Sequence, residues 1–169
     1  MSAHSSSDNS NPFSPTPQKA GALNRILVID DDPDTRQFCV DALTGSGYRV
    51  DSASDGESGW KVLGTVSYES DNYDLLITDN NMPVLTGLEL IDKVRAARIT
   101  VPIILVSGEL PEVIRAAVDA KAPLPQQAWN QSLQISAALP KPFTIGELLQ
   151  TVKEVLRLSS TENGRSHSG

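Results

Sequence analysis

Short apolar runs alternate with longer amphipathic stretches through the middle of the chain. Residues 25–29, 73–78 and 101–106 are continuous apolar runs, residues 48–53 alternate apolar with polar side chains, and a weaker run follows at 135–140. Short continuous runs are typical of strands buried on both faces of a parallel sheet. Helical patterns separate these runs. The order predicts an α/β fold with a doubly wound, five-stranded parallel sheet and helices on both faces.

Signals for helix starts lie between the expected strands. Asp32 and Pro33 offer an N-cap and a first-turn proline, and this helix is expected to end near Gly45 to Gly47. A further helix is expected near 109–120. Three pairs have the spacing of a capping box, in which a Ser or Thr and a Glu three residues later bond each other's backbone N–H groups. These pairs are Ser54 with Glu57, Thr86 with Glu89, and Thr144 with Glu147.

Both ends of the chain are polar and poor in large apolar residues. Residues 1–23 are rich in Ser, Pro and Asn, and residues 159–169 read SSTENGRSHSG. Such segments bury too little apolar surface to offset the entropy lost on ordering. We therefore expect one folded domain over residues 24–158, with a disordered tail on each side.

Charge and cysteine content narrow the function classes. The 169 residues carry a net charge of −7, which argues against direct nucleic-acid binding because that depends on Lys and Arg at phosphates. A lone Cys39 excludes an internal disulfide and suits a reducing compartment. No signal-peptide pattern and no apolar run of about 18 residues occurs, so a cytoplasmic location without membrane contact is expected. His4 and His167 lie in the polar ends, so mechanisms with a core histidine are not expected.

Polar side chains gather where the strands are expected to end. Asp30 and Asp31 follow the first strand, Asp79 the third, Ser107 the fourth and Lys141 the fifth. Ligands of such sheets bind beyond the carboxyl ends of the strands. Two carboxylates ~4 Å apart repel by about 4 kcal/mol at an intermediate dielectric, and a bound cation is the usual way to offset this. On the residues alone, the aspartates could instead cap helices or loops, the serine could bond the backbone, and the lysine could face solvent.

Four sequence blocks resemble the receiver domain of bacterial two-component response regulators. The blocks are ILVIDDDPDTR, DLLITDNNMPVLTG, IILVSGE and LPKPF, in that order. The resemblance covers residues 24–158 and implies a flavodoxin-like fold with strand order 2-1-3-4-5. After residue 158 nothing resembles an output domain, so a stand-alone receiver is expected. A receiver excised from a larger regulator is the competing interpretation.

The resemblance implies that Asp79 is a phosphoacceptor. Asp30, Asp31, Asp79 and the backbone carbonyl of Asn81 would then hold Mg²⁺ or Mn²⁺. In the family, the side chains at the positions of Asn81 and Glu109 control the access of hydrolytic water. Both are polar here, so a short-lived phosphoryl group is expected.

The resemblance further implies that Lys141 and Ser107 contact the phosphoryl group, and that the Lys141–Pro142 peptide is cis. Because the folded body has no histidine, the donor is expected to be a phosphohistidine on a sensor histidine kinase or histidine phosphotransfer protein. The protein would catalyse its own phosphorylation and dephosphorylation without being a conventional enzyme. It would signal by a conformational shift to an unknown downstream protein, as a monomer or weak dimer.

Three features depart from the family pattern. Ala138 stands where the family often has an aromatic switch residue. Residues 121–134, which include Trp129, form an extended segment that is either an inert loop or a modified partner surface. Residues 64–74 are also longer than usual, and we interpret them as a solvated loop.

Two other function classes share parts of this sequence pattern. A degenerate receiver would act as a phosphorylation-independent binding module, although the acidic pair, the acceptor and the lysine are all present. A haloacid-dehalogenase-like phosphatase also uses a strand-end aspartate with Mg²⁺. That family requires D-x-D-x-T/V, and Asp34 stands here at the position of the Thr or Val.

Overall fold

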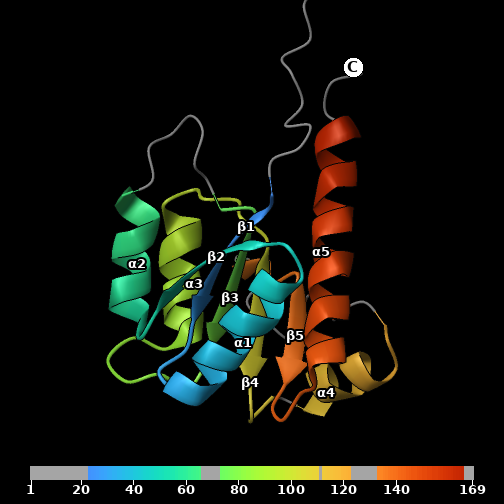
Figure 1. Cartoon of the computed structure of the whole chain (residues 1–169), viewed down its shortest axis with the longest axis horizontal. Helices are drawn as coiled ribbons and strands as arrows, with labels where there is room; N and C mark the ends of the chain where they lie inside the picture. Colours follow the sequence, from blue (N-terminus) through green and yellow to red (C-terminus); the bar gives the residue numbers. More distant parts are fainter. Residues whose placement is uncertain (1–22, 66–72, 111, 123–132, 166–169) are drawn as a thin grey trace, which may run out of the picture.

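The computed structural model describes residues 23–65, 73–110, 112–122 and 133–165 (Figure 1). Five parallel strands pair in the order β2-β1-β3-β4-β5. This arrangement confirms the doubly wound, flavodoxin-like sheet predicted above. The strands are β1 (Arg25–Ile29), β2 (Arg49–Ala53), β3 (Leu75–Asp79), β4 (Ile103–Ser107) and β5 (Ala137–Pro140).

Helices cover both faces of the sheet. In Figure 1, α1 and α5 lie together over one face, α2 and α3 over the other, and α4 lies near β5. The helices are α1 (Pro33–Gly45), α2 (Gly56–Thr65), α3 (Gly87–Ala96), α4 (Glu112–Asp119) and α5 (Ile145–Arg165). Within the described residues, none of these helices has the length and apolar character needed to cross a bilayer.

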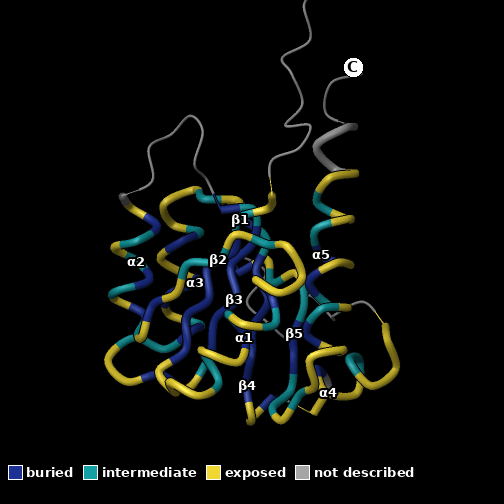
Figure 2. Tube along the Cα trace, in the orientation of Figure 1, coloured by how far each residue is buried: buried dark blue, intermediate teal, exposed yellow. Residues whose placement is uncertain are grey.

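The core forms two layers, one on each side of the sheet. Leu27 and Ile29 of β1 pack in the layer under α2 and α3, whereas Ile26 and Val28 pack in the layer under α1 and α5. The alternation follows from the two-residue period of a strand. Both sets are buried, as the dark central strands in Figure 2 show. Such two-sided burial explains why the strands appear as continuous apolar runs in the sequence.

Most of the predicted helix starts are confirmed. Asp32 caps α1, and the Thr86 and Glu89 side chains form a complete capping box at α3. Thr144 and Glu147 make the same reciprocal exchange at α5, where the Thr144 N–H donates to the Glu147 carboxylate at 2.7 Å.

The prediction of a capping box at the start of α2 is wrong. Oδ1 of Asp55 accepts from the backbone N–H of Ser58 at 2.7 Å, so Asp55 caps the helix. The Ser54 hydroxyl instead donates to Asp55 at 3.1 Å, and the Ser54–Glu57 box does not form. Asp and Ser are about equally good N-caps, so local preference does not distinguish two adjacent candidates.

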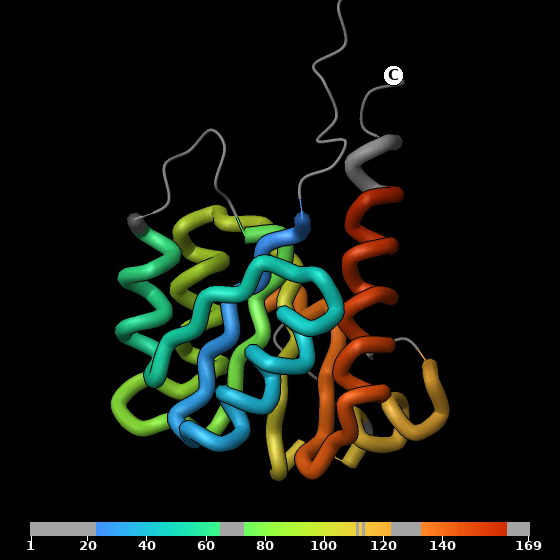
Figure 3. The backbone as a smooth tube through the Cα atoms, in the orientation of Figure 1, coloured from blue at the N-terminus to red at the C-terminus, as the bar shows by residue number. Residues whose placement is uncertain are grey.

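The last helix continues beyond the boundary expected at residue 158. α5 extends to Arg165, and Figure 3 shows it running past the edge of the sheet. The hydroxyls of Ser159, Ser160 and Thr161 each donate to the carbonyl four residues earlier. A helix already nucleated in the core propagates through polar residues at little cost, so composition alone placed this boundary too early.

The two extended segments fall partly outside the described residues. Gly64 and Thr65 are the last residues of α2, and Tyr73 is buried, so the expected loop is shorter than 64–74. Residues 123–132, with Trp129, are not described, and the expectation for them stays a prediction. Where the chain resumes before β5, the Arg95 guanidinium donates to the backbone carbonyls of Leu133, Gln134, Ile99 and Val101.

A polar network fixes the amino ends of the central strands. The Asp51 carboxylate accepts from Arg25 Nε at 2.7 Å and from the Tyr73 hydroxyl at 2.9 Å. Partial burial raises the pKa of Asp51, but the bonds from Arg25 and Tyr73 outweigh it and lower the pKa below its ordinary value. The stabilisation is therefore present above the unfolded-state pKa and is lost as the pH falls through the folded-state pKa.

Asp51→Asn is expected to lower the free energy of unfolding at pH 7 by about 1 kcal/mol, because two hydrogen bonds to a charged acceptor are weakened. The difference from the wild type should shrink below a pH of about 4, where the free carboxyl is protonated. Urea unfolding at pH 7 and at pH 3 measures both values. Exposed Asp119→Asn removes the same charge without these bonds and should have little effect at either pH. A pH-independent loss in Asp51→Asn would contradict the role of this network.

Candidate functional site

The candidate residues lie at the carboxyl edge of the sheet. Asp30 and Asp31 directly follow β1, and Asp79 and Ser107 are the last residues of β3 and β4. Lys141 directly follows β5 and is joined to Pro142 by a cis peptide bond, as the resemblance implied. Parallel strands bring their ends to one edge, so residues far apart in the sequence meet there.

Lys141 links the two buried carboxylates. Its Nζ lies 2.9 Å from Oδ2 of Asp30 and 3.0 Å from Oδ1 of Asp79, and these carboxylate side chains are only 5% and 4% exposed. Burial lowers the pKa of Lys141, but the bonds and charges of Asp30 and Asp79 outweigh it and raise the pKa. The ammonium group is therefore charged at neutral pH, and the solvent-facing interpretation of this lysine is wrong.

Each buried carboxylate also accepts a backbone N–H bond. Oδ1 of Asp30 accepts from Asp32 at 2.9 Å, and Oδ2 of Asp79 accepts from Asn81 at 3.0 Å. Burial nevertheless raises the pKa of Asp30, because desolvation exceeds the opposing effects of Lys141 and the Asp32 N–H. Lys141 therefore does not fully offset the cost of burying the Asp30 carboxylate.

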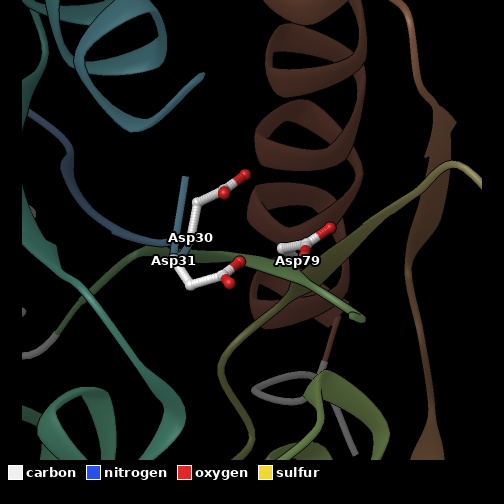
Figure 4. Close-up of side chains that lie close together, drawn as sticks. All are labelled: Asp30, Asp31 and Asp79. Carbon is white, nitrogen blue, oxygen red and sulfur yellow. The ribbon is translucent and has the colours of Figure 1, made fainter. Parts of the chain in front are cut away.

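Asp31 completes an acidic cluster with Asp30 and Asp79. One carboxylate oxygen from each lies within 4.8 Å of the others (Figure 4). Asp30 and Asp79 are buried, whereas Asp31 is exposed. An all-oxygen donor set with one side open to solvent fits Mg²⁺ or Mn²⁺, which prefer oxygen ligands and retain water. The residues present are thus suited to hold such a cation.

Ser107 is buried but bonds the backbone. Its hydroxyl donates to the carbonyl of Glu109 at 3.2 Å and accepts from the Glu109 N–H at 3.1 Å. This arrangement matches the backbone-bonding interpretation left open above. Beside it, Ala138 packs with Leu110 and Ile114 in a small apolar cluster, in the place where the family often has an aromatic residue.

The side chains of Asn81 and Glu109 are exposed at the same edge. Arg36 of α1 also takes part in the geometry of the site, and the sequence analysis did not single it out. Its Nη1 donates to the backbone carbonyl of Asp30 at 2.6 Å. No signal in the sequence could have identified this bond, because every residue supplies a backbone carbonyl.

The chain is similar to known proteins over most of its length. The family model of the response regulator receiver domain matches residues 26–153. The response regulator MprA of Mycolicibacterium vanbaalenii is 31% identical over 145 residues, which cover 85% of this chain and 55% of that protein. The chain thus spans about half the length of the curated relatives that it matches.

Solved structures show the same fold. The chemotaxis response regulator CheY4 of Vibrio cholerae is 26% identical, with a TM-score of 0.62 over 79% of this chain and 99% of that one. A response regulator receiver protein from Pseudomonas putida is 28% identical, with a TM-score of 0.61 over 79% and 98%. Together with the family match and the strand order, these similarities show that the chain belongs to the response regulator receiver domains of two-component systems.

Proposed function

We propose that Asp79 accepts a phosphoryl group from a phosphohistidine on a partner protein. The observation that carries this proposal is the position of the Asp79 carboxylate. It is buried at the end of β3, bonded by Lys141 and the Asn81 N–H, and adjacent to two further carboxylates. A carboxylate oriented in this way can act as a nucleophile toward phosphorus.

In the proposed transfer, an Asp79 oxygen attacks the phosphorus as the bond between phosphorus and the histidine nitrogen breaks. The electron pair of that bond stays on the imidazole, and an acyl phosphate forms on Asp79. Lys141 already lies 3.0 Å from an Asp79 oxygen, so its ammonium group can neutralise a phosphoryl oxygen. Ser107 would leave its bonds to Glu109 and donate to the same group.

The carboxylates of Asp30, Asp31 and Asp79, with the backbone carbonyl of Asn81, would hold Mg²⁺ or Mn²⁺. When bound, the cation neutralises the carboxylates and the anionic phosphoryl oxygens, which would otherwise repel each other. The support is the oxygen-only cluster and its excess of negative charge over Lys141.

The donor is proposed to be a sensor histidine kinase or a histidine phosphotransfer protein, because the described body of the chain contains no histidine. A downstream protein would then distinguish the phosphorylated from the unphosphorylated form. Since the curated relatives extend well beyond the matched region, the nature of that downstream step is left to experiment.

The phosphoryl group is expected to be short-lived. Water attacks the phosphorus, the bond to the Asp79 oxygen breaks, and inorganic phosphate leaves. Asn81 and Glu109 are exposed polar side chains next to the site and would admit that water. Replacing both, as Asn81→Met with Glu109→Leu, is expected to slow the decay roughly tenfold.

The decay is measured by recording the intact mass of the purified phosphorylated protein over time. Glu112→Leu, an exposed acidic position on α4, serves as a control that should decay at the wild-type rate. An unchanged rate in the double variant would show that these two side chains do not govern water access.

The proposed function is tested by incubating the full chain with acetyl phosphate, with and without Mg²⁺, and recording intact mass. A gain of one phosphoryl group that requires Mg²⁺ is expected. No gain with the cation present, combined with no binding of beryllofluoride, would contradict the proposal. That result would favour a binding module that keeps the receiver fold without phosphorylation.

A further inference from the structure

The chain bends sharply where it leaves β1. Neighbouring residues of a strand point to opposite faces of the sheet, yet Asp30 and Asp31 both contribute an oxygen to the same cluster as Asp79. The strand ends at Ile29 and the bend lies at Asp31. Convergence of the two carboxylates therefore depends on the peptide groups of this bend being held in one orientation.

Arg36 holds these peptide groups from the first turn of α1. Its Nη1 donates to the carbonyl of Asp30 at 2.6 Å and reaches the carbonyl of Asp31 at 3.5 Å. On the other side of the bend, the Asp32 N–H donates to the Asp30 carboxylate at 2.9 Å. The guanidinium therefore bonds the backbone on one side of the bend, and the Asp32 N–H orients the Asp30 carboxylate on the other.

The location of Arg36 is unfavourable for the helix itself. The Arg36 N–H donates to the Asp32 carbonyl at 3.0 Å and so closes the first turn of the helix. The positive end of the helix dipole lies there and repels a cation. The helix dipole gives no reason for an arginine at this position, whereas the bonds to the two carbonyls give one.

Arg36 does not bond the carboxylates of the cluster themselves. Among the described residues, the carboxylates in ion pairs are bonded to Arg25 or Lys141, not to Arg36. The guanidinium thus lies near the acidic cluster but contacts the backbone of Asp30 and Asp31, not their carboxylates.

We infer that Arg36 is a positioning residue for a divalent cation at this site, acting through the backbone of Asp30 and Asp31. This inference rests on the proposed function. Residues that orient metal ligands typically change metal affinity by about 10–100-fold when they are replaced. The opposite sign is expected if Arg36 acts only through its charge, because removing a nearby cation strengthens the binding of Mg²⁺.

The test is calorimetric titration of the full chain with Mg²⁺ alone. Arg36→Met keeps the aliphatic volume and loses the donors, and it is expected to weaken Mg²⁺ binding roughly tenfold. Both bonds come from the single Nη1 atom, and Arg36→Lys keeps the charge on a flexible stem that is less pre-organised than the planar guanidinium, so an intermediate loss of about threefold is expected. Thermal unfolding followed by circular dichroism shows whether each variant is folded at the titration temperature. If Arg36→Met is unfolded, the Arg36→Lys titration decides the test.

Arg49→Met is the matched control, because it removes the same charge at the amino end of β2, across the sheet from the site. It should bind Mg²⁺ within about twofold of the wild type, since charges that far apart are largely screened.

Asp30→Asn, which removes a proposed ligand, should weaken binding strongly. If Asp30→Asn weakens binding but the folded Arg36 variants bind as tightly as the wild type, or more tightly, the Arg36 inference fails and the metal site stands. If the wild type does not bind Mg²⁺ at all, both fail.

Discussion

Asp79→Asn is expected to abolish labelling by acetyl phosphate. The amide keeps the shape of the carboxylate and can still accept from the Asn81 N–H, but it has no anionic oxygen to form an acyl phosphate. Lys141 keeps its bond to Asp30, so the fold should persist. The intact mass after incubation with Mg²⁺ and acetyl phosphate should match that of the untreated protein.

Asp34→Asn is the matched control for this variant. Asp34 lies exposed in the first turn of α1, outside the acidic cluster, so the same chemical change there should leave labelling intact. Labelling of Asp79→Asn at the wild-type level would show that another residue is the acceptor. Loss of labelling in Asp34→Asn would show that the assay responds to charge rather than to the site.

Gly87→Ala is expected to destabilise the protein by about 2–3 kcal/mol, the upper part of the usual range for an overpacked interior. A Cβ on Gly87 would overlap the carbonyl oxygen of Asp79 and lie 2.9 Å from the Asn80 Cα. Both are backbone atoms, which cannot rotate away as the end of a side chain could. The Gly87 N–H also donates to the Asn80 carbonyl at 3.1 Å, so the helix start and the acceptor loop would move together. Labelling of Asp79 should therefore slow as well.

Gly64→Ala provides a control with the opposite expected sign. Gly64 lies in α2, and a Cβ there would meet nothing within 4 Å. Alanine at a position whose backbone conformation it can adopt gains roughly 0.4–1 kcal/mol over glycine, because the unfolded chain has less freedom to lose. Urea unfolding of the two variants separates a specific clash from a general effect of glycine replacement. Equal or reversed effects would contradict the packing of α3 against the acceptor loop.

The sheet was predictable because both of its faces are buried, which produces continuous apolar runs. The strand boundaries were less predictable. Tyr73 and Val101 are buried but lie before β3 and β4, so an apolar run begins earlier than the hydrogen-bonded strand. Hydrophobicity reports burial rather than backbone pairing, and the two diverge at strand ends.

The candidate site was predictable in position but not in detail. Strand-end geometry is sufficient to bring Asp30, Asp79 and Lys141 together, because parallel strands end at one edge. The bonds between Ser107 and the Glu109 backbone could not be predicted, since a hydroxyl has several partners within reach. The bond from Arg36 to a backbone carbonyl leaves no motif in the sequence, because any residue supplies a carbonyl.

The most direct test of the central claim is to locate the phosphoryl group chemically. The protein is labelled with acetyl phosphate and Mg²⁺ and then reduced with borohydride, which converts an aspartyl phosphate to homoserine. Peptide mass spectrometry then identifies the modified residue. Homoserine is expected at position 79, with unmodified aspartate at positions 30 and 31. Homoserine at another aspartate, with position 79 unchanged, would contradict this assignment.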